Sequence, residues 1–263
     1  MVNKISFIVK TFKRYDCLEK LLKSLYDYYP EADVIVADDN EKINRKFYKK
    51  WSKVKLIQLP FDSGLSVGRN EAIKASDKEF ILLLDDDFIF TDETDIEKFY
   101  KIINYDNEIG VVGGCCLEHG SEVHYEHKFT FNNGVLKHVS DGDIWKTIDK
   151  IRFKYTECVL NFALFRKEVF KDIQWDDKLK LAEHIDFYLR FKDTKWKVAY
   201  TPIVKIIHQK VRDEDYKYWR SRAKDFSIMM FKKHKIRKMI TQKGTTTVLR
   251  GNNKLFTYKT KII

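Results

Sequence analysis

The chain has 263 residues, of which 44% are hydrophobic and 14% aromatic. This length allows one α/β domain with an appendage, and this composition excludes a disordered chain. Lys and Arg number 50 and Asp and Glu number 39, so the formal net charge is +11. Such a charge favours an acidic partner, which could be a nucleotide, an anionic membrane surface, an acidic glycan or nucleic acid.

The N-terminal residues form no long apolar stretch, so we predict neither a secretory signal nor a membrane span. Four cysteines, at positions 17, 115, 116 and 158, lack the paired spacing of a metal site. The adjacent Cys115 and Cys116 would make an awkward disulfide framework. Reduced thiols are typical of the cytosol, and we therefore expect a cytoplasmic protein.

Short apolar runs alternate with amphipathic or polar segments through the first half of the chain. This alternation predicts a largely parallel, doubly wound sheet with helices on both faces. We expect strands at residues 4–9, 34–37, 54–59 and 80–84, and helices from Asp16, over residues 41–51 and from Ser63 through Ala72.

The second half is less regular, and it ends in a basic stretch. A two-domain division follows, with an α/β domain over residues 1–208 and a basic, helical C-terminal extension over residues 209–263. We expect strands at 110–116, 123–131, 157–165, 198–200 and 203–207, a hairpin turn at Asn132-Asn133-Gly134, a short helix from Arg166 and a helix over Glu183–Phe191.

Carboxylates follow two of the expected strands directly. Asp38 and Asp39 end the second strand, and Asp85-Asp86-Asp87 end the fourth. In open α/β sheets ligands bind beyond the carboxyl ends of the strands. Three adjacent carboxylates repel one another unless a cation compensates, and hard oxygen ligands suit Mg²⁺ or Mn²⁺. The simpler alternative is a solvated acidic turn that caps the next helix.

These elements occur in an order that resembles a known family. KTFKR at 10–14 follows the first strand, ADD at 37–39 the second, GLSVGRN at 64–70 opens a helix, and LDDDF at 84–88 ends the fourth strand. The chain thereby resembles the inverting nucleotide-sugar glycosyltransferases of the GT-A fold, family 2 in the broad sense. Within them it is most similar to the ganglioside-type β-1,4-N-acetylgalactosaminyltransferases. The resemblance implies a Rossmann-like GT-A fold with a mostly parallel central sheet.

The resemblance also implies a nucleotide-binding role for the first strand ends. Thr11 and Asp39, with help from Asp38, would frame the uracil of a UDP-sugar, since a carboxylate can accept its imide N–H. Arg69 would lie near the nucleotide as a planar cation. Without the resemblance, Arg69 would be interpreted as a surface residue of a helix.

A metal site is implied at the fourth strand end. Asp85 or Asp86 would approach the ribose or the sugar, and Asp87 would ligate Mn²⁺ or Mg²⁺. His208, which ends the apolar run VKIIH, would complete the metal shell, because neutral imidazole is a suitable ligand. From its position alone, an ordinary hydrogen-bonded histidine at a strand end is expected.

The catalytic base is expected in the segment LAEHIDF at 181–187. Inverting transfer needs a base for the acceptor hydroxyl. Many relatives have adjacent Glu and Asp there, but this chain has His184 after Glu183. We favour Asp186 as the base with Glu183 as the second choice, and either could instead cap the helix N-terminus. Asn161 is implied to lie beside the donor sugar, where a purely structural hydrogen-bonding role is equally open.

The C-terminal stretch DYKYWRSRAKDFSIMMFKKHKIRKMI mixes basic residues with aromatics and Met. It could lie on the inner, anionic face of the membrane as a peripheral contact. The alternative is a helix that packs over the α/β domain and exposes a solvated basic face.

Together, these features predict a metal-dependent inverting glycosyltransferase. It would transfer a sugar, with GalNAc favoured, from a UDP-sugar to a glycan or glycolipid acceptor of the cell surface. The same fold could use UDP-Gal, UDP-GlcNAc or UDP-Glc. A non-catalytic glycan-binding protein is a further alternative. A nucleic-acid-binding protein would not explain three Asp at a strand end, so we expect no nucleic-acid partner.

Overall fold

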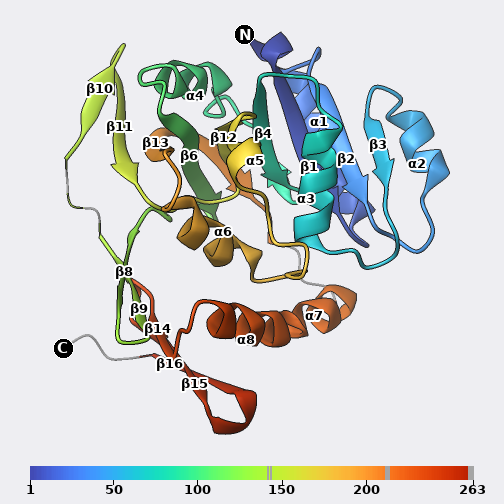
Figure 1. Ribbon diagram of the computed structural model, residues 1–263. Coiled ribbons are helices and arrows are strands. Elements are labelled where there is room, and N and C mark those ends of the chain that lie inside the picture. The colour runs from blue at the N-terminus through green and yellow to red at the C-terminus, as the bar shows by residue number, and fades with distance from the viewer. Residues whose placement is uncertain (141, 143, 211–213, 260–263) are drawn as a thin grey trace.

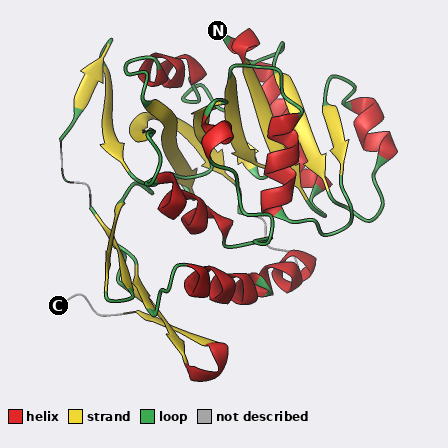
Figure 2. Ribbon diagram, in the orientation of Figure 1, coloured by secondary structure: helices red, strands yellow, loops and turns green. Residues whose placement is uncertain are grey.

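The computed structural model describes residues 1–140, 142, 144–210 and 214–259. Its larger sheet occupies the upper part of Figure 1, and helices cover both faces (Figure 2). β5 (Phe88–Ile89) pairs with β13 (Lys197–His208), and β7 (Ser121–Val123) pairs with β6 (Ile109–Glu118). The other strands follow the order β10 (Lys146–Ile148), β11 (Ile151–Thr156), β13 (Lys197–His208), β6 (Ile109–Glu118), β12 (Ala163–Arg166), β4 (Phe80–Asp85), β1 (Ile5–Thr11), β2 (Asp33–Asp38) and β3 (Lys55–Gln58).

The four strands predicted in the first half form one parallel block. β1 pairs in parallel with both β2 and β4, and β2 pairs in parallel with β3. In this register Thr11 lies opposite Asp38, and Lys10 lies opposite Asp85. The polar residues that follow the apolar runs therefore meet at one edge of the sheet, as predicted.

The core has one part on each face of the sheet. Ile5, Phe7 and Val9 of β1 pack into a cluster with α1 (Tyr15–Tyr28) and α4 (Ile96–Ile103). Ile8 points the other way, into a cluster with α3 (Leu65–Lys74) and α6 (Glu183–Phe191). This alternation is the period of a strand, and burial on both faces explains why the strand sequences are continuously apolar.

Helices on both faces of the sheet complete the architecture. Helix α1 buries the leucine stripe predicted from the sequence, at positions 18, 21, 22 and 25. No helix within the described residues combines the length and the apolar character needed to cross a bilayer. The remaining short helices are η1 (Val2–Lys4), α2 (Arg45–Lys50), α5 (Val169–Asp172) and η2 (Gly251–Asn253).

The second half differs in places from the prediction. β12 pairs antiparallel with both β4 and β6, so the sheet is mixed. The strand predicted over 157–165 begins only at Ala163, because Cys158 forms an isolated bridge with His127 outside the ladder. The strands predicted at 198–200 and 203–207 are one strand, β13. Its register shifts around Pro202, which has no N–H for the ladder.

The C-terminal region is helical only at first. α7 (Glu214–Ser221) and α8 (Ala223–Lys233) agree with the prediction, but strands follow them. These strands form a second sheet, β16 (Lys254–Lys259), β15 (Thr245–Arg250), β14 (Lys238–Ile240), β9 (Val135–Val139) and β8 (Lys128–Asn132). Because β14 pairs with β9, the residues after 208 are joined to the earlier chain (Figure 1). The turn of the β8–β9 hairpin is Asn133-Gly134, both with positive φ, as the predicted hairpin turn requires.

Candidate active site

The polar strand ends open into a cleft of about 320 Å³. The ends of β1, β4 and β13, the starts of α3 and α6, and the α7–α8 segment contribute to its lining. The position beyond the carboxyl ends of parallel strands is the usual ligand site of an open α/β sheet. Of the residues predicted for the site, Arg69, Asp85, Asp87, Glu183 and His208 line this cleft.

Asp86 lies behind the cleft lining and is buried. Thr11 Oγ1 donates a hydrogen bond of 2.9 Å to its carboxylate, and Arg14 forms an ion pair with it. Burial raises the pKa of Asp86 to about 6, although the Arg14 guanidinium opposes the rise. Thr11 and Asp86 thus hold each other, and within the described residues neither lines the cleft.

Asp87 faces the cleft with an incompletely satisfied carboxylate. Arg14 Nη1 donates to Oδ2 at 2.9 Å, but the buried Oδ1 accepts no hydrogen bond among the described residues. His208 Nε2 lies 3.4 Å from that oxygen. Burial disfavours the charged form, but His208 and Arg14 together lower the pKa of Asp87. The site therefore presents an ionised oxygen that faces the imidazole of His208.

His208 is oriented by a second carboxylate. Its Nδ1 lies 2.9 Å from Glu118 Oε1, which leaves Nε2 directed at Asp87. Burial alone would lower the pKa of His208, but Asp87 and Glu118 raise it above its ordinary value. A carboxylate behind an imidazole is the usual support of a metal-ligating histidine. Asp87 and His208 therefore fit a divalent cation, with Glu118 as the supporting group.

The carboxylates at the end of β2 are engaged inside the protein. Asp38 accepts hydrogen bonds of 2.7 Å from both Tyr15 and Tyr48. Asp39 forms a 2.6 Å ion pair with Lys10, and its pKa is raised by burial, which Lys10 opposes. Among the described residues Asp38 and Asp39 do not line the cleft, whereas Lys10 does. Both carboxylates support the strand end from within the protein.

Arg69 connects the strand-end cluster to α6. It is 2% exposed, which excludes the surface role expected from its position alone. Its Nη1 lies 2.5 Å from Glu183 Oε1, its Nη2 lies 3.4 Å from Asp85 Oδ1, and its guanidinium stands over the Trp175 ring. A rigid, planar guanidinium group can hold two carboxylates in fixed positions.

The two candidate bases on α6 have different surroundings. Glu183 lines the cleft and pairs with Arg69. Asp186 is fully buried beside α8, with Lys233 Nζ at 2.6 Å, His234 Nε2 at 2.8 Å and Arg190 Nη2 at 2.8 Å. Burial would raise the pKa of Asp186, but hydrogen bonds from His234 and Lys233 and the charge of Arg190 lower it to about 2. The geometry therefore favours Glu183 over Asp186, in the reverse of the order predicted from the sequence.

His184, the departure from the family pattern, lines the cleft and supports the cluster through Asn161. Its Nδ1 lies 3.0 Å from Asn161 Oδ1, and Asn161 Nδ2 donates to both carboxylate oxygens of Asp85 at 3.2 Å. Burial lowers the pKa of His184 to about 4, so the imidazole is neutral at pH 7. A neutral ring that donates through Nδ1 fixes the orientation of the Asn161 amide. Asn161 itself lines the cleft, beside Asp85.

Gly113 and Gly114 meet a packing requirement. A Cβ on Gly114 would lie 2.6 Å from the carbonyl oxygen of Val204 and 2.7 Å from the Phe162 ring. Within the described residues neither glycine lines the cleft. Their small size lets β6 approach the segment that carries Asn161.

Several residues of the cleft had no predicted role. Arg14, just after β1, reaches Asp86 and Asp87. Trp219 of α7 lines the cleft and packs edge-on against Phe12 and Phe61, with ring centroids 5.1 and 5.6 Å apart. Arg220 and Arg222 line it as well, so the basic C-terminal stretch contributes cations to the site. The only sequence signal was their basic and aromatic composition.

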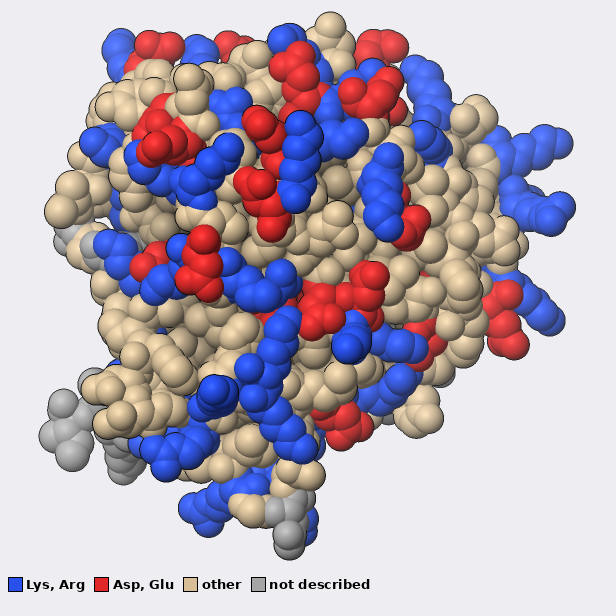
Figure 3. Space-filling model, viewed as in Figure 1, with Lys and Arg blue, Asp and Glu red and all other residues tan. Residues whose placement is uncertain are grey.

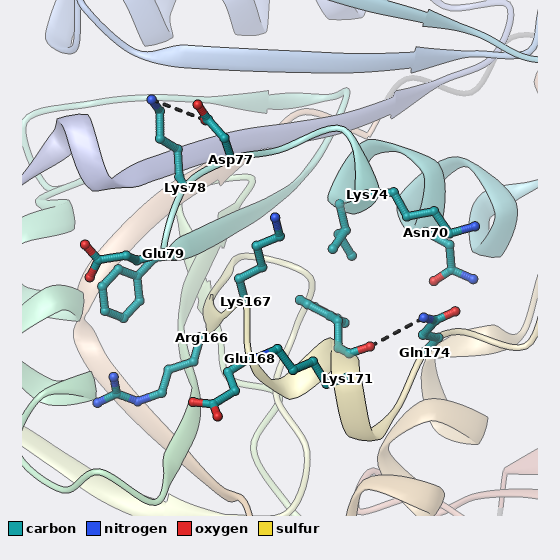
Figure 4. Close-up of a pocket in the computed structure, with 13 residues that line it drawn as sticks. Asn70, Lys74, Asp77, Lys78, Glu79, Arg166, Lys167, Glu168, Lys171 and Gln174 are labelled. Carbon is teal, nitrogen blue, oxygen red and sulfur yellow. Dashed lines mark hydrogen bonds and ion pairs between the residues drawn. The ribbon is translucent and has the colours of Figure 1, made fainter.

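A second, larger cavity of about 640 Å³ lies at the other end of α3 and β4 (Figure 4). Its lining residues form ion pairs with their own neighbours, such as Lys78 with Asp77 at 3.3 Å and Glu79 with Lys4 at 3.0 Å. Lys167 and Arg166 reach backbone carbonyls and so hold segments together. This cavity is remote from the carboxyl ends of the strands and shares none of the predicted site residues.

Comparisons with known proteins agree with this site. The family model described as glycosyl transferase family 2 matches residues 6–174. The chain is 31% identical over 190 residues to mouse beta-1,4 N-acetylgalactosaminyltransferase 2, which covers 71% of this chain and 36% of that protein. The chain thus spans about a third of the length of the curated relatives it matches.

Two solved structures share the fold. Staphylococcus aureus TarS 1–349 in complex with UDP-GlcNAc has a TM-score of 0.61 and 18% identity, over 86% of this chain and 65% of that one. GalNAc-T7 with UDP, GalNAc and Mn²⁺ has a TM-score of 0.63 and 13% identity, over 78% and 43%. These similarities identify the architecture as that of the GT-A glycosyltransferases.

Proposed function

The chain belongs to glycosyl transferase family 2, and we propose that it is a metal-dependent, inverting enzyme that transfers GalNAc from UDP-GalNAc to a cell-surface glycan. The observation that carries this proposal is the carboxylate of Asp87 in the cleft, with a buried oxygen that lacks a hydrogen bond and faces His208. An oxygen and an imidazole nitrogen placed in this way fit a cation that also binds phosphate oxygens.

The choice of donor is supported by the relatives. The mouse relative is named an N-acetylgalactosaminyltransferase, and GalNAc-T7 was crystallised with UDP and GalNAc. TarS, whose structure contains UDP-GlcNAc, supports UDP-GlcNAc as the alternative donor. GlcNAc differs from GalNAc only in the configuration of its C4 hydroxyl. All of these donors carry a uridine diphosphate.

The charges of the cleft match a diphosphate. A divalent cation held by Asp87 and His208 would neutralise the diphosphate as it leaves. Arg220 and Arg222 line the same cleft and add positive charge on the α7–α8 side. Hydrogen-bond donors and cations that are fixed in position around a developing negative charge stabilise the transition state without having to reorganise.

Glu183 is the proposed base. Its carboxylate would accept the proton of the acceptor hydroxyl as that oxygen forms a bond to the anomeric carbon, while the bond from this carbon to the diphosphate breaks. Attack from the face opposite to the leaving group inverts the configuration. Arg69 holds Glu183 in position through its ion pair, and Asn161 holds Asp85 in the same wall.

Peripheral membrane contact is a separate proposal. α8 and the loop after it carry the exposed side chains Lys224, Lys232, Lys235 and Arg237. Lys and Arg predominate on this face around α8 and the C-terminal strands (Figure 3). A surface of this charge suits the anionic inner leaflet.

The direct test is the release of UDP from UDP-GalNAc, UDP-GlcNAc, UDP-Gal and UDP-Glc, each with and without Mn²⁺. We expect Mn²⁺-dependent release that is fastest with UDP-GalNAc and is abolished by a chelator. If none of the four donors is hydrolysed or used in transfer, the enzyme proposal fails. Retained glycan binding without hydrolysis would instead support the non-catalytic alternative.

A further inference from the structure

A cysteine, a glutamate and a histidine gather on the larger sheet outside the cleft. Cys115 of β6, Glu122 of β7 and His124, just after β7, each offer one ligand atom, and these atoms lie within 4.8 Å of one another. Among the described residues, none of the three lines the cleft. The spacing of the cysteines in the sequence did not indicate this group, because only one cysteine takes part in it.

Cys115 is buried but has polar neighbours. In the part of the chain that the structure describes, the two apolar clusters of the core include Cys116 and Cys158 but not Cys115. Its sulfur lies 3.7 Å from the carbonyl oxygen of Val123, and the hydroxyl of Tyr200 is a further hydrogen-bond partner. A sulfur among polar groups is available to ligate an ion, whereas a sulfur in an apolar cluster behaves as a small hydrophobic group.

His124 is oriented through one of its ring nitrogens. Its Nδ1 lies 2.5 Å from the hydroxyl oxygen of Tyr200, and its Nε2 lies 3.2 Å from Oε2 of Glu122. When the N–H of Nδ1 donates to Tyr200, the lone pair of Nε2 is free for a cation. A hydrogen bond on the second nitrogen is the usual support of a metal-ligating histidine.

Glu122 is held by its other oxygen. Nζ of Lys205 lies 3.0 Å from Oε1, which leaves Oε2 on the side of His124. Lys205 lies opposite Cys115 in the register of β6 and β13, so the same strand pair carries the ligand and this support. The side chains of Glu122 and His124 are 42% and 43% exposed, and an ion can therefore enter from solvent.

The spacing and the chemistry of the group suit zinc. A tetrahedral zinc ion with bonds of about 2.0–2.3 Å separates its ligand atoms by about 3.3–3.8 Å. The distance of 3.2 Å between Glu122 Oε2 and His124 Nε2 is already close to this range. A soft thiolate favours Zn²⁺, whereas the oxygen and imidazole ligands of the cleft also suit the harder Mn²⁺.

We propose that Cys115, Glu122 and His124 form a zinc site with water as the fourth ligand. The thiol would release its proton to solvent as the sulfur binds the ion. The ion would join β6 to β7 and to the segment that leads into β8. β6 also carries Glu118, which orients His208, so the site would stiffen a strand that supports the cleft. The inference does not depend on the identity of the sugar donor.

Co²⁺ is the probe, because it replaces Zn²⁺ and its bond to a thiolate absorbs in the near ultraviolet by charge transfer. The Asp87–His208 pair in the cleft has no thiolate and does not give this absorption. We expect the reduced, full-length chain to develop the absorption with Co²⁺ and to lose it when Zn²⁺ is added. An about tenfold excess of Mn²⁺ over Co²⁺ should leave it in place. If the wild type develops no such absorption, the proposal fails.

Two pairs of variants locate the ion. Cys115→Ser should abolish the absorption, and Cys17→Ser, a buried cysteine of α1, should keep it. His124→Ala should weaken Co²⁺ binding by at least about tenfold. His119→Asn removes an exposed imidazole from the β6–β7 turn and suits the positive φ of that residue, and it should bind Co²⁺ as the wild type does. Absorption that survives Cys115→Ser, or unchanged affinity in His124→Ala, would overturn the assignment.

Asp87→Ala separates the zinc site from the proposed metal site of the cleft. This variant should keep the thiolate absorption, and its loss would show that the two sites are not independent. Melting temperatures measured in the Asp87→Ala background provide a second result. Zn²⁺ should raise the melting temperature, since an ion that binds only the folded chain stabilises it. Adding His124→Ala should reduce this rise, and an equal rise with and without His124 would contradict the proposal.

Discussion

At the scale of single residues, two acidic side chains in one helical turn have different roles. Glu183 lines the cleft and forms an ion pair with Arg69. Asp186 instead contacts Lys233 and His234 of the C-terminal region. The sequence places both in the first turn of α6 and could not separate them. Their partners come from segments far away in the chain, and only the fold brings these together.

Glu183→Gln tests the assignment of the base. Glutamine keeps the size of the side chain and can still accept a hydrogen bond from Arg69, but it cannot take the proton. We expect kcat for transfer to fall by about 10²–10⁴-fold with little change in UDP affinity. In the matched variant Asp186→Asn, kcat should stay near the wild-type value below the melting temperature. Loss of kcat in Asp186→Asn with unchanged UDP binding would return the role to Asp186.

Asp186→Ala should destabilise the fold. The variant leaves Arg190, Lys233 and His234 without their shared carboxylate, and we expect a loss of about 1–3 kcal/mol in the free energy of unfolding. The folded-state pKa of Asp186, about 2, lies below its ordinary value of 3.8. Its contribution is therefore present above pH 4 and lost as the pH falls toward 2. Urea titrations of both proteins at pH 7 and pH 3 should show the difference shrinking at the lower pH.

At the scale of elements, a pair of stacked histidines packs within the β8–β9 hairpin, one in β9 and one directly before β8. The rings of His127 and His138 stack with centroids 4.1 Å apart and planes 12° apart. Both are buried, and the Nε2 of each has no hydrogen-bond partner among the described residues. Burial lowers the pKa of His127 to about 3 and that of His138 to about 4. The hairpin is therefore built around two neutral imidazoles.

This pair predicts a loss of stability in mild acid. The folded-state pKa values lie below the ordinary 6.5, so the unfolded chain takes up protons first as the pH falls. The stabilisation is complete above pH 6.5 and declines by on the order of 1–3 kcal/mol toward pH 4. Thermal melts from pH 7.5 to 4.5 should show this decline in the wild type and a smaller one in His138→Phe. An equal decline in both would contradict the account.

Elements with a strong local period could be predicted, and elements defined by distant pairing could not. The leucine stripe of α1 and the apolar run of β4 were sufficient for their assignment. The strands β14 to β16 were missed because β14 depends on a partner, β9, about a hundred residues earlier in the chain. α4 was missed although Ile96, Phe99 and Ile103 carry a helical period. The helical period of α4 could therefore have been recognised in the sequence.

At the scale of the whole molecule, the C-terminal region completes the cleft that the first half of the chain begins. Trp219 and Arg222 come from residues outside the segment matched by the family model, yet they line the same cavity as Asp85 and Asp87. The side of the site that is proposed to bind the metal could be predicted from strand-end carboxylates. The covering side could not, because no local pattern indicates where α7 packs.

Trp219→Ala should weaken donor binding. The indole lines the cleft and packs against Phe12 and Phe61, so its loss opens the site to solvent and frees both rings. We expect the KM for the UDP-sugar to rise by about 3–30-fold, with a smaller effect on kcat. Tyr218→Ala removes the exposed neighbouring ring and is the control. Equal effects of the two variants on KM would argue against a role for α7 in donor binding.

The binding of UDP with Mn²⁺, measured by calorimetry, tests the central claim most directly. The wild type should bind UDP only when Mn²⁺ is present, and Asp87→Ala and His208→Ala should each lose that dependence together with at least about tenfold in affinity. Asp92→Ala, an exposed carboxylate five residues further on, should behave as the wild type. Undiminished Mn²⁺-dependent binding in Asp87→Ala would contradict the assignment of this strand end as the metal site of a glycosyltransferase.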